Sequence, residues 1–113
     1  MALDWNEANL ERIRDSRIPK GPGVYVIKQV KRIMGLPVRH EIIYVGKTNS
    51  LQRRFKEHCS PRSEHNIELL HASWSKKLEF WFAEVSKDEL DGVERDLIRR
   101  LEPETNIVRY RRR

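Results

Sequence analysis

The sequence predicts an α/β protein of the α+β kind, with a small three-stranded, mainly antiparallel sheet flanked by helices. Three observations lead to this fold class. Apolar, β-branched or aromatic runs occupy 24–27, 42–45 and 78–85, apolar residues recur at helical spacing near 51–58 and 89–101, and 113 residues suit one core. We therefore expect a single domain over 1–113.

The N-terminal part predicts a helix and then a hairpin. Asp4 and Glu7 have the spacing of a capping box, which indicates a helix running to about Asp15 or Ser16. The runs 24–27 and 42–45 are then expected to pair as two strands. Between them, Gly35-Leu36-Pro37 should break the chain. The connection is expected to be a long, basic loop containing Lys31, Arg32 and Arg39.

A helix should follow the second strand and continue to about His58, before Pro61. Its possible N-caps are Thr48, Asn49 and Ser50. Residues 63–72 form a weaker helical candidate.

The last third predicts a strand and the clearest helix of the chain. The run 78–85 is apolar enough to be a central strand. Ser86 and Glu89 form a second capping box at the start of the helix, which Pro103 ends.

Charge and composition indicate the kind of partner. The net charge is 23 minus 17, or +6, which favours an anionic partner. Four of these charges lie in the tail 109–113, which either grips phosphates or is a solvated end. Cys59 is the only cysteine, so no internal disulfide can form. No apolar run has membrane-spanning length and no signal-peptide pattern opens the chain, so we expect a cytoplasmic protein without a membrane partner.

Glu94 occupies an unusual place in the last helix. At about 100° per residue it falls about 40° from Leu90, inside the apolar stripe that continues through Leu97. A carboxylate on a buried face is costly unless it is paired, protonated or bound to metal. Glu94 therefore either reaches the helix edge, or pairs with a buried arginine, or binds a metal where other polar groups converge.

Other polar residues point the same way. On the helix after the second strand, Arg54 and His58 flank the inward face while Arg53 faces water. If the first two strands pair, Tyr25 and Tyr44 can share one face. Nearby are Gly46, which would allow a close approach, and Lys47, which with the backbone N–H groups of 46–49 could meet a phosphate.

Together these positions resemble the GIY-YIG nuclease superfamily. Gly23-Val24-Tyr25, preceded by Pro22, is similar to the first half of the family motif, and Tyr44-Val45-Gly46 is similar to the second half. The family's later residues match Lys47, Arg54, Glu94 and Asn106. The resemblance spans 22–106, the expected core.

The resemblance implies hydrolysis of a DNA phosphodiester with one divalent cation, Mg2+ or Mn2+, held by Glu94. Arg54 would clamp phosphate oxygens. Either Tyr25 or Tyr44 would activate the attacking water, with Lys47 assisting; Tyr25 is preferred, but the choice stays open. His58 would lie near the phosphate and Asn106 would organise the site. The residues expected to bind DNA are Gly46, Lys47, Arg54, Asn106, Arg109 and Arg111.

A DNA endonuclease is thus the leading hypothesis. The alternative is a non-catalytic nucleic-acid-binding module with the same fold. Such a module needs no carboxylate beside a phosphate, so the complete set of residues favours the enzyme. The sequence shows no helix-turn-helix or zinc finger, so we expect weak sequence preference, or targeting by DNA structure or by a partner protein.

Overall fold

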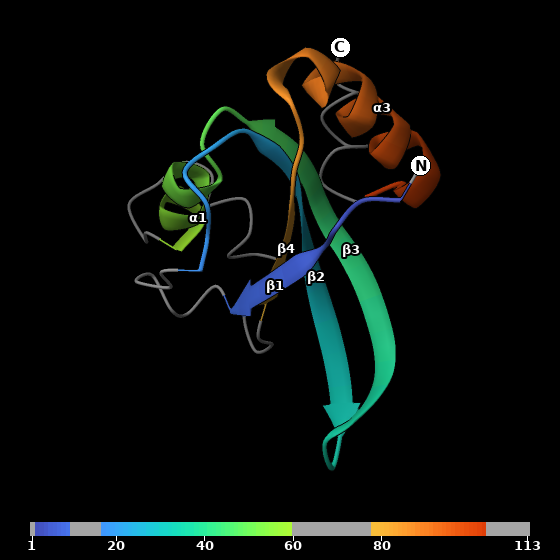
Figure 1. Cartoon of the computed structure of the whole chain (residues 1–113). Coiled ribbons are helices and arrows are strands. Elements are labelled where there is room, and N and C mark those ends of the chain that lie inside the picture. The colour runs from blue at the N-terminus through green and yellow to red at the C-terminus, as the bar shows by residue number, and fades with distance from the viewer. Residues whose placement is uncertain (1, 10–16, 60–77, 104–113) are drawn as a thin grey trace.

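The computed structural model describes residues 2–9, 17–59 and 78–103. Its four strands form one antiparallel sheet in the order β1-β4-β2-β3, and helices α1 and α3 lie on opposite sides of it (Figure 1). The elements are β1 (Asn6–Asn9), β2 (Gly23–Ile33), β3 (Leu36–Thr48), α1 (Leu51–Cys59), β4 (Leu78–Glu84), a 3-10 turn (Lys87–Glu89) and α3 (Leu90–Leu101). The α+β class is as expected, but the sheet has four strands rather than three.

Alternation along the strands divides the core between the two faces of the sheet. Tyr25 and Ile27 of β2 point toward α1, where they pack with Phe55 and Phe80. Val24, which lies between Gly23 and Tyr25, points to the opposite face of the sheet. That face belongs to α3 and its core consists of Val24, Ala83, Val85 and Leu90.

The predicted N-terminal helix is wrong over its described part. Asn6–Asn9 is strand β1, which pairs with β4 so that Ala8 lies opposite Phe80. Without β1, one edge of β4 would expose unpaired backbone groups, and pairing them outweighs the weak local preference of a capping box. Residues 10–16, where the predicted helix was to continue, lie outside the described residues.

The predicted long basic loop is also wrong, because the chain stays paired almost to its tip. β2 continues to Ile33, β3 begins at Leu36, and only Met34 and Gly35 form the turn. Both turn residues have positive φ, 53° and 87°, as a two-residue hairpin turn requires. Pro37 does not break the strand, because β3 is an edge strand and its outer side needs no donor.

Ser50 is the N-cap of α1. Its Oγ accepts a hydrogen bond from the backbone N–H of Arg53 at 3.3 Å. The N–H groups of Leu51 and Gln52 donate to the carbonyls of Gly21 and Pro19, both at 3.0 Å. The leading amides of α1 are therefore used inside the protein.

Gly23 sets how closely α1 approaches the sheet. A Cβ atom at this position would lie 2.4 Å from the carbonyl oxygen of Ala83 and 2.6 Å from Cδ1 of Leu51. No real Cβ contact is that short, so a side chain at Gly23 would push β2 away from either β4 or α1. The glycine thus fixes the start of α1 beside the strands.

The last helix begins differently from the prediction. The Ser86 side chain makes no capping hydrogen bond; the N–H of Glu89 donates instead to the Ser86 carbonyl at 2.9 Å, forming the 3-10 turn. Regular α-helix starts at Leu90 and ends at Leu101. Glu102 adopts a left-handed conformation directly before Pro103, so the helix stops before Pro103 as predicted. The predicted central strand is confirmed, because β4 lies between β1 and β2.

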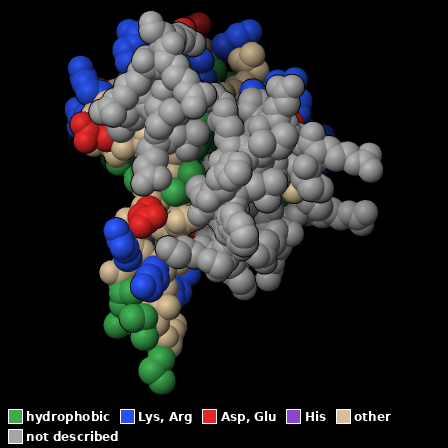
Figure 2. Space-filling model, turned by 180° about the vertical axis from the view of Figure 1, so that it is seen from behind, with side chains coloured by type: hydrophobic (Ala, Val, Ile, Leu, Met, Phe, Trp, Pro, Cys, Tyr) green, Lys and Arg blue, Asp and Glu red, His purple; other side chains and the backbone are tan. Residues whose placement is uncertain are grey.

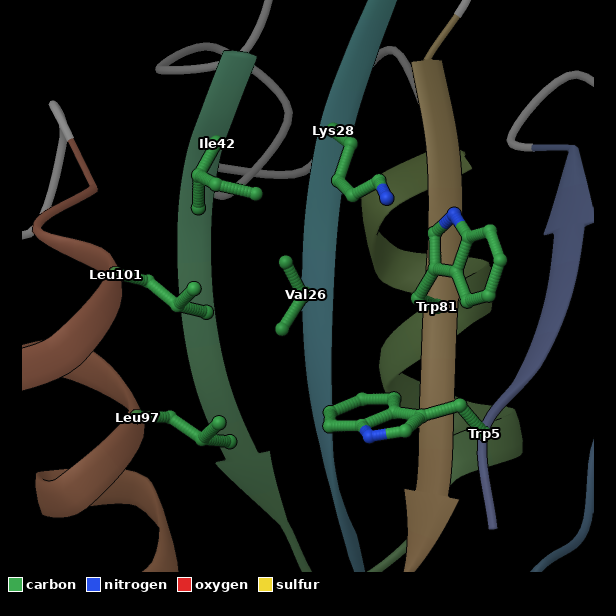
Figure 3. Close-up of a pocket in the computed structure, with 7 residues that line it drawn as sticks. All are labelled: Trp5, Val26, Lys28, Ile42, Trp81, Leu97 and Leu101. Atoms are coloured by element: carbon green, nitrogen blue, oxygen red, sulfur yellow. The ribbon is translucent and has the colours of Figure 1, made fainter. Parts of the chain in front are cut away.

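The apolar stripe of α3 covers its face of the sheet only in part. Leu90 is buried, whereas Leu97 and Leu101 border a hollow of about 340 Å³ between helix and sheet (Figure 3). The Lys28 ammonium lies 4.4 Å from the ring centre of Trp81 at this hollow. The remaining lining residues are Trp5, Val26 and Ile42.

Neither of the helices described is long and apolar enough to cross a membrane. Residues 63–72, Pro61 and the tail 109–113 lie outside the described residues.

Candidate active site

Tyr25 and Gly46 meet across the β2–β3 pairing. The register places them directly opposite each other, on the α1 face of the sheet. A Cβ atom on Gly46 would lie 2.3 Å from both Cζ and the hydroxyl oxygen of Tyr25. The hydroxyl end of the phenol therefore occupies the space that any side chain at position 46 would need, so only glycine fits there. This close contact explains why tyrosine and glycine occur together here.

Tyr44 joins Tyr25 through an irregularity in β3. The register advances from Ile27–Tyr44 to Lys28–Ile42, so Ile43 is an extra residue in a β-bulge. The bulge lets Ile43 enter the core while Tyr44 stays on the same face. The two phenol rings lie 6.0 Å apart, which confirms the expectation that they share a face.

His58, on α1, contacts the hydroxyl of Tyr25. Its Nε2 atom lies 3.1 Å from the Tyr25 hydroxyl, and both side chains are buried. Phe80 stacks on the other side of the phenol, with ring centres 5.1 Å apart. The inward orientation of His58 was predicted, whereas its direct hydrogen bond to Tyr25 was not. Spacing along the sequence gives no sign of a contact between residues 33 positions apart.

Burial governs the protonation of Tyr25. Desolvation raises the pKa of its phenol well above 10, and the neighbouring Tyr44 adds to the rise through its charge and a hydrogen bond. The Arg54 guanidinium opposes the shift without reversing it, while Glu94 contributes a further small rise in the same pKa. Tyr25 is therefore a neutral phenol at neutral pH, and Tyr44, Arg54 and Glu94 all lie near enough to act on it electrostatically.

Arg54 and Arg53 differ as the helical geometry predicts. The Arg54 side chain is 21% exposed and the Arg53 side chain 66%. Arg54 lies on a polar hollow of about 370 Å³ where β3, α1 and α3 begin or end. The hollow is cationic, since four basic side chains and one carboxylate line it: Lys47, Arg53, Arg54, Lys87 and Asp91, together with Thr48, Asn49 and Leu90.

Glu94 approaches the free edge of β3. Its carboxylate accepts a hydrogen bond from the backbone N–H of Lys47, while the Lys47 ammonium pairs with Asp91. The pKa of Asp91 is lowered by this hydrogen bond and charge. Desolvation raises the pKa of Glu94, and the Lys47 charge does not cancel the effect. Glu94 is thus a half-buried carboxylate with a hydrogen bond and, among the described residues, no ion-pair partner.

These features fit a single divalent cation at Glu94. Magnesium binds through one or two protein carboxylates and takes its other ligands from water and phosphate. The described residues contain no cluster of three or more His, Cys, Asp or Glu side chains able to hold a metal by themselves. A one-carboxylate site completed by water and substrate is the arrangement that Glu94 allows.

Some expected site residues cannot be placed, and others were not foreseen. Asn106, Arg109 and Arg111 lie outside the described residues. The sequence reasoning missed Asp91 as the partner of Lys47, although Asp91 precedes Glu94 by three residues and so lies on a neighbouring position of the helix surface. It also missed Phe80, which holds the Tyr25 ring.

The chain belongs to the GIY-YIG family. The family's sequence model for the GIY-YIG catalytic domain matches residues 21–107, which include both half-motifs, Arg54 and Glu94.

Among proteins of known name, the chain is similar to UvrABC system protein C. It is 30% identical over 92 residues to the protein from Hydrogenobaculum sp. and 28% identical over 101 residues to that from Haloarcula marismortui. These matches cover 81% and 89% of the chain but only 14% and 16% of those proteins.

The fold is similar to that of a solved relative, the GIY-YIG N-terminal endonuclease domain of UvrC from Thermotoga maritima. Two point mutants of that domain, each bound to its catalytic divalent cation, superpose with TM-scores of 0.54 and 0.53. Sequence identity is 22% and 23%, and each match covers 82% of this chain and 92% of the other.

The raised pKa of Glu94 predicts a pH-dependent effect on stability. The folded protein holds this proton more tightly than the unfolded chain, so ionisation of Glu94 lowers the free energy of unfolding as pH rises through the folded pKa. Glu94→Gln should therefore be more stable than the parent at pH 7, by less than about 1 kcal/mol after solvent screening. The gain should vanish below the unfolded pKa of about 4.5.

Urea unfolding at pH 4 and pH 7 measures this difference. Glu89→Gln, at an exposed carboxylate just before α3, is the matched control and should change stability by less than about 0.5 kcal/mol at either pH. A Glu94→Gln protein that is less stable at pH 7 would show that Glu94 is a structural ion-pair partner.

Proposed function

We propose that this domain is a divalent-metal-dependent endonuclease that hydrolyses DNA phosphodiester bonds. One observation carries the proposal. Glu94, half-buried and without an ion-pair partner among the described residues, and Arg54, on a cationic hollow, both act electrostatically on Tyr25, which is hydrogen-bonded to His58. Membership of the GIY-YIG family and likeness to a UvrC endonuclease domain that binds a catalytic divalent cation support it.

Glu94 would hold the cation, Mg2+ or Mn2+. When bound, the cation supplies charge that stabilises the phosphate and the leaving oxygen. The carboxylate is already oriented, because the Lys47 backbone N–H fixes one of its oxygens. Its desolvation also favours exchange of a proton for a metal ion, since the bare negative charge is poorly compensated.

The phosphate would bind in the cationic hollow. Arg54 offers a planar set of donors that matches phosphate oxygens, and its partly buried position limits competition from water. Lys47 borders the same hollow, and its pairing with Asp91 holds the ammonium at the rim. In this proposal Lys47 attracts and positions the substrate, while Arg54 stabilises charge that develops on the phosphate.

The two phenols divide the task of activating water. Tyr25 is only 1% exposed and strongly favours its neutral form, so it is poorly placed to take a proton from water directly. Tyr44 is half-buried and hydrogen-bonded to Tyr25, which in turn contacts His58. We infer that Tyr44, not Tyr25, touches the attacking water.

A proton can then pass along this chain of groups. The relay needs the Tyr25 hydroxyl turned so that it donates to Nε2 of His58 and accepts from Tyr44. As the water oxygen attacks phosphorus and the bond from phosphorus to the leaving oxygen breaks, the water proton moves to the Tyr44 oxygen, the Tyr44 proton moves to Tyr25, and the Tyr25 proton moves to Nε2 of His58. The released oxygen takes a proton from solvent. An imidazole is a far better proton acceptor at neutral pH than a phenol. The relay leaves the proton on His58 as an imidazolium, with both phenols neutral, so no phenolate has to persist in the buried site.

Cleavage of supercoiled plasmid tests the proposal. Pure protein with Mg2+ or Mn2+ should nick or linearise the plasmid, and excess chelator should stop the reaction. Glu94→Gln should lower the rate by a factor of at least about 100, because it removes the metal ligand while keeping the shape of the side chain. Binding of plasmid without any cleavage by the parent protein, with either metal, would favour the non-catalytic binding module.

Neighbouring arginines provide a matched pair. Arg54→Ala should lower the cleavage rate by about 100-fold or more, whereas Arg53→Ala should lower it by less than about tenfold. Both variants remove one positive charge from α1, so a general loss of DNA attraction affects them equally. Equal losses in single-turnover cleavage would show that Arg54 does not contact the reacting phosphate.

A further inference from the structure

The β2–β3 hairpin extends beyond the rest of the fold. Pairing of β2 with β4 ends at Gln29, and every residue from 31 to 40 is exposed. We call residues 31–40 the arm. Figure 1 shows it projecting from the end of the sheet away from both helices; within the described part of the chain its β2 and β3 residues pair only with each other. The arm contributes nothing to the core, so packing does not dictate its sequence.

The tip of the arm is unexpectedly apolar. Exposed fractions are 56% for Ile33, 102% for Met34, 65% for Leu36 and 47% for Val38. Met34 also has a φ of 53°, in a turn that favours asparagine or glycine. A freely solvated hairpin gains nothing from such residues, and exposed apolar clusters of this kind mark contact surfaces.

The sides of the arm are basic. Residues 31–40 contain Lys31, Arg32, Arg39 and His40, and no carboxylate. Figure 2 shows the apolar tip with basic side chains directly behind it. Two carboxylates outside the arm, Glu79 and Glu41, approach Arg32 and Arg39 at 3.3 Å, but both arginine side chains are exposed, at 48% and 68%, so each guanidinium still faces solvent.

The arm and the candidate active site share one side of the ribbon. By alternation along β2, Lys31 and Ile33 follow Tyr25 on the same face, and the register puts Arg39 and Leu36 opposite them. Tyr44 lies opposite Ile27 and Leu36 lies opposite Ile33, so the distance along the ribbon is six steps of β2. At about 3.4 Å per residue the tip lies roughly 20 Å from the phenol.

We propose that the arm is a second DNA-binding element, which holds the duplex about six base pairs from the cleaved bond, at about 3.4 Å per base pair. Lys31 and Arg39 contact phosphates, and Met34 with its apolar neighbours enters the minor groove as a wedge between base steps. The inference rests on the proposed function for its substrate. It predicts that the protein bends or unstacks DNA and that sites which are easy to deform are preferred.

The binding experiment is done in chelator, so that no cleavage occurs. Affinity for a short duplex is measured over a range of potassium chloride concentrations for the parent, the double variant Lys31→Gln with Arg39→Gln, and the control Arg99→Gln with Arg100→Gln. The control removes the same charge from exposed positions at the end of α3. The arm variant should bind about tenfold more weakly at low salt, with the slope of log affinity against log salt reduced by about 0.9 per lost contact. The control should keep the parent slope.

The tip is tested separately with 2-aminopurine in the duplex, whose fluorescence rises when a base loses stacking. The parent should raise this signal on binding. Met34→Asn keeps a residue suited to the turn and should fold normally, but it should lose most of the rise at equal occupancy.

Each outcome decides a distinct point. Arm variants that match the α3 control in affinity, slope and fluorescence would overturn the inference even if the parent cuts plasmid. Unchanged DNA binding together with lost binding to anionic vesicles, or with loss of a dimer in sedimentation, would also overturn it in favour of another partner. Weaker DNA binding by the arm variants supports the arm as a DNA-binding element even if the parent protein never cleaves DNA. Absence of cleavage would overturn only the proposed nuclease activity.

Discussion

The contact between the Tyr25 ring and the backbone of Gly46 organises the rest of the site. It exists because β2 and β3 pair in a register that sets these residues opposite each other. With no Cβ beneath it, the phenol lies low enough to reach His58 on α1 and to stack on Phe80 of β4. One small residue on β3 thus lets side chains from three other elements meet.

The same contact determines the chemistry, because it buries the phenol. A buried Tyr25 stays neutral and is closed to water, and in the proposed mechanism it passes a proton on while the more accessible Tyr44 meets the substrate. Burial acts similarly on Glu94, whose desolvated charge is not balanced by an ion pair within the described residues. Both groups are less stable in their charged forms here than in water, which is typical of functional sites.

Much of this arrangement could be predicted from local patterns. Helical geometry distinguished Arg54 from Arg53 and placed Glu94 among apolar neighbours, because those relations depend only on spacing within one helix. Relations between distant segments could not be obtained in this way. The capping-box pattern at Asp4 gave a helix where pairing with β4 makes a strand, and Pro37 suggested a break that an edge strand does not require. The Tyr25–His58 hydrogen bond likewise depends on how α1 packs.

Single-turnover cleavage of duplex DNA by Gly46→Ala tests the central claim most directly, with Gly92→Ala as the control. An added Cβ at Gly46 collides with Tyr25, whereas nothing lies within 4 Å of one at Gly92. Gly92→Ala should cleave at the parent rate. Gly46→Ala should remain folded but cleave at least about 100-fold more slowly, because displacing a site group by about 1 Å has effects of that size. A folded Gly46→Ala protein that cleaves at the parent rate would contradict the account.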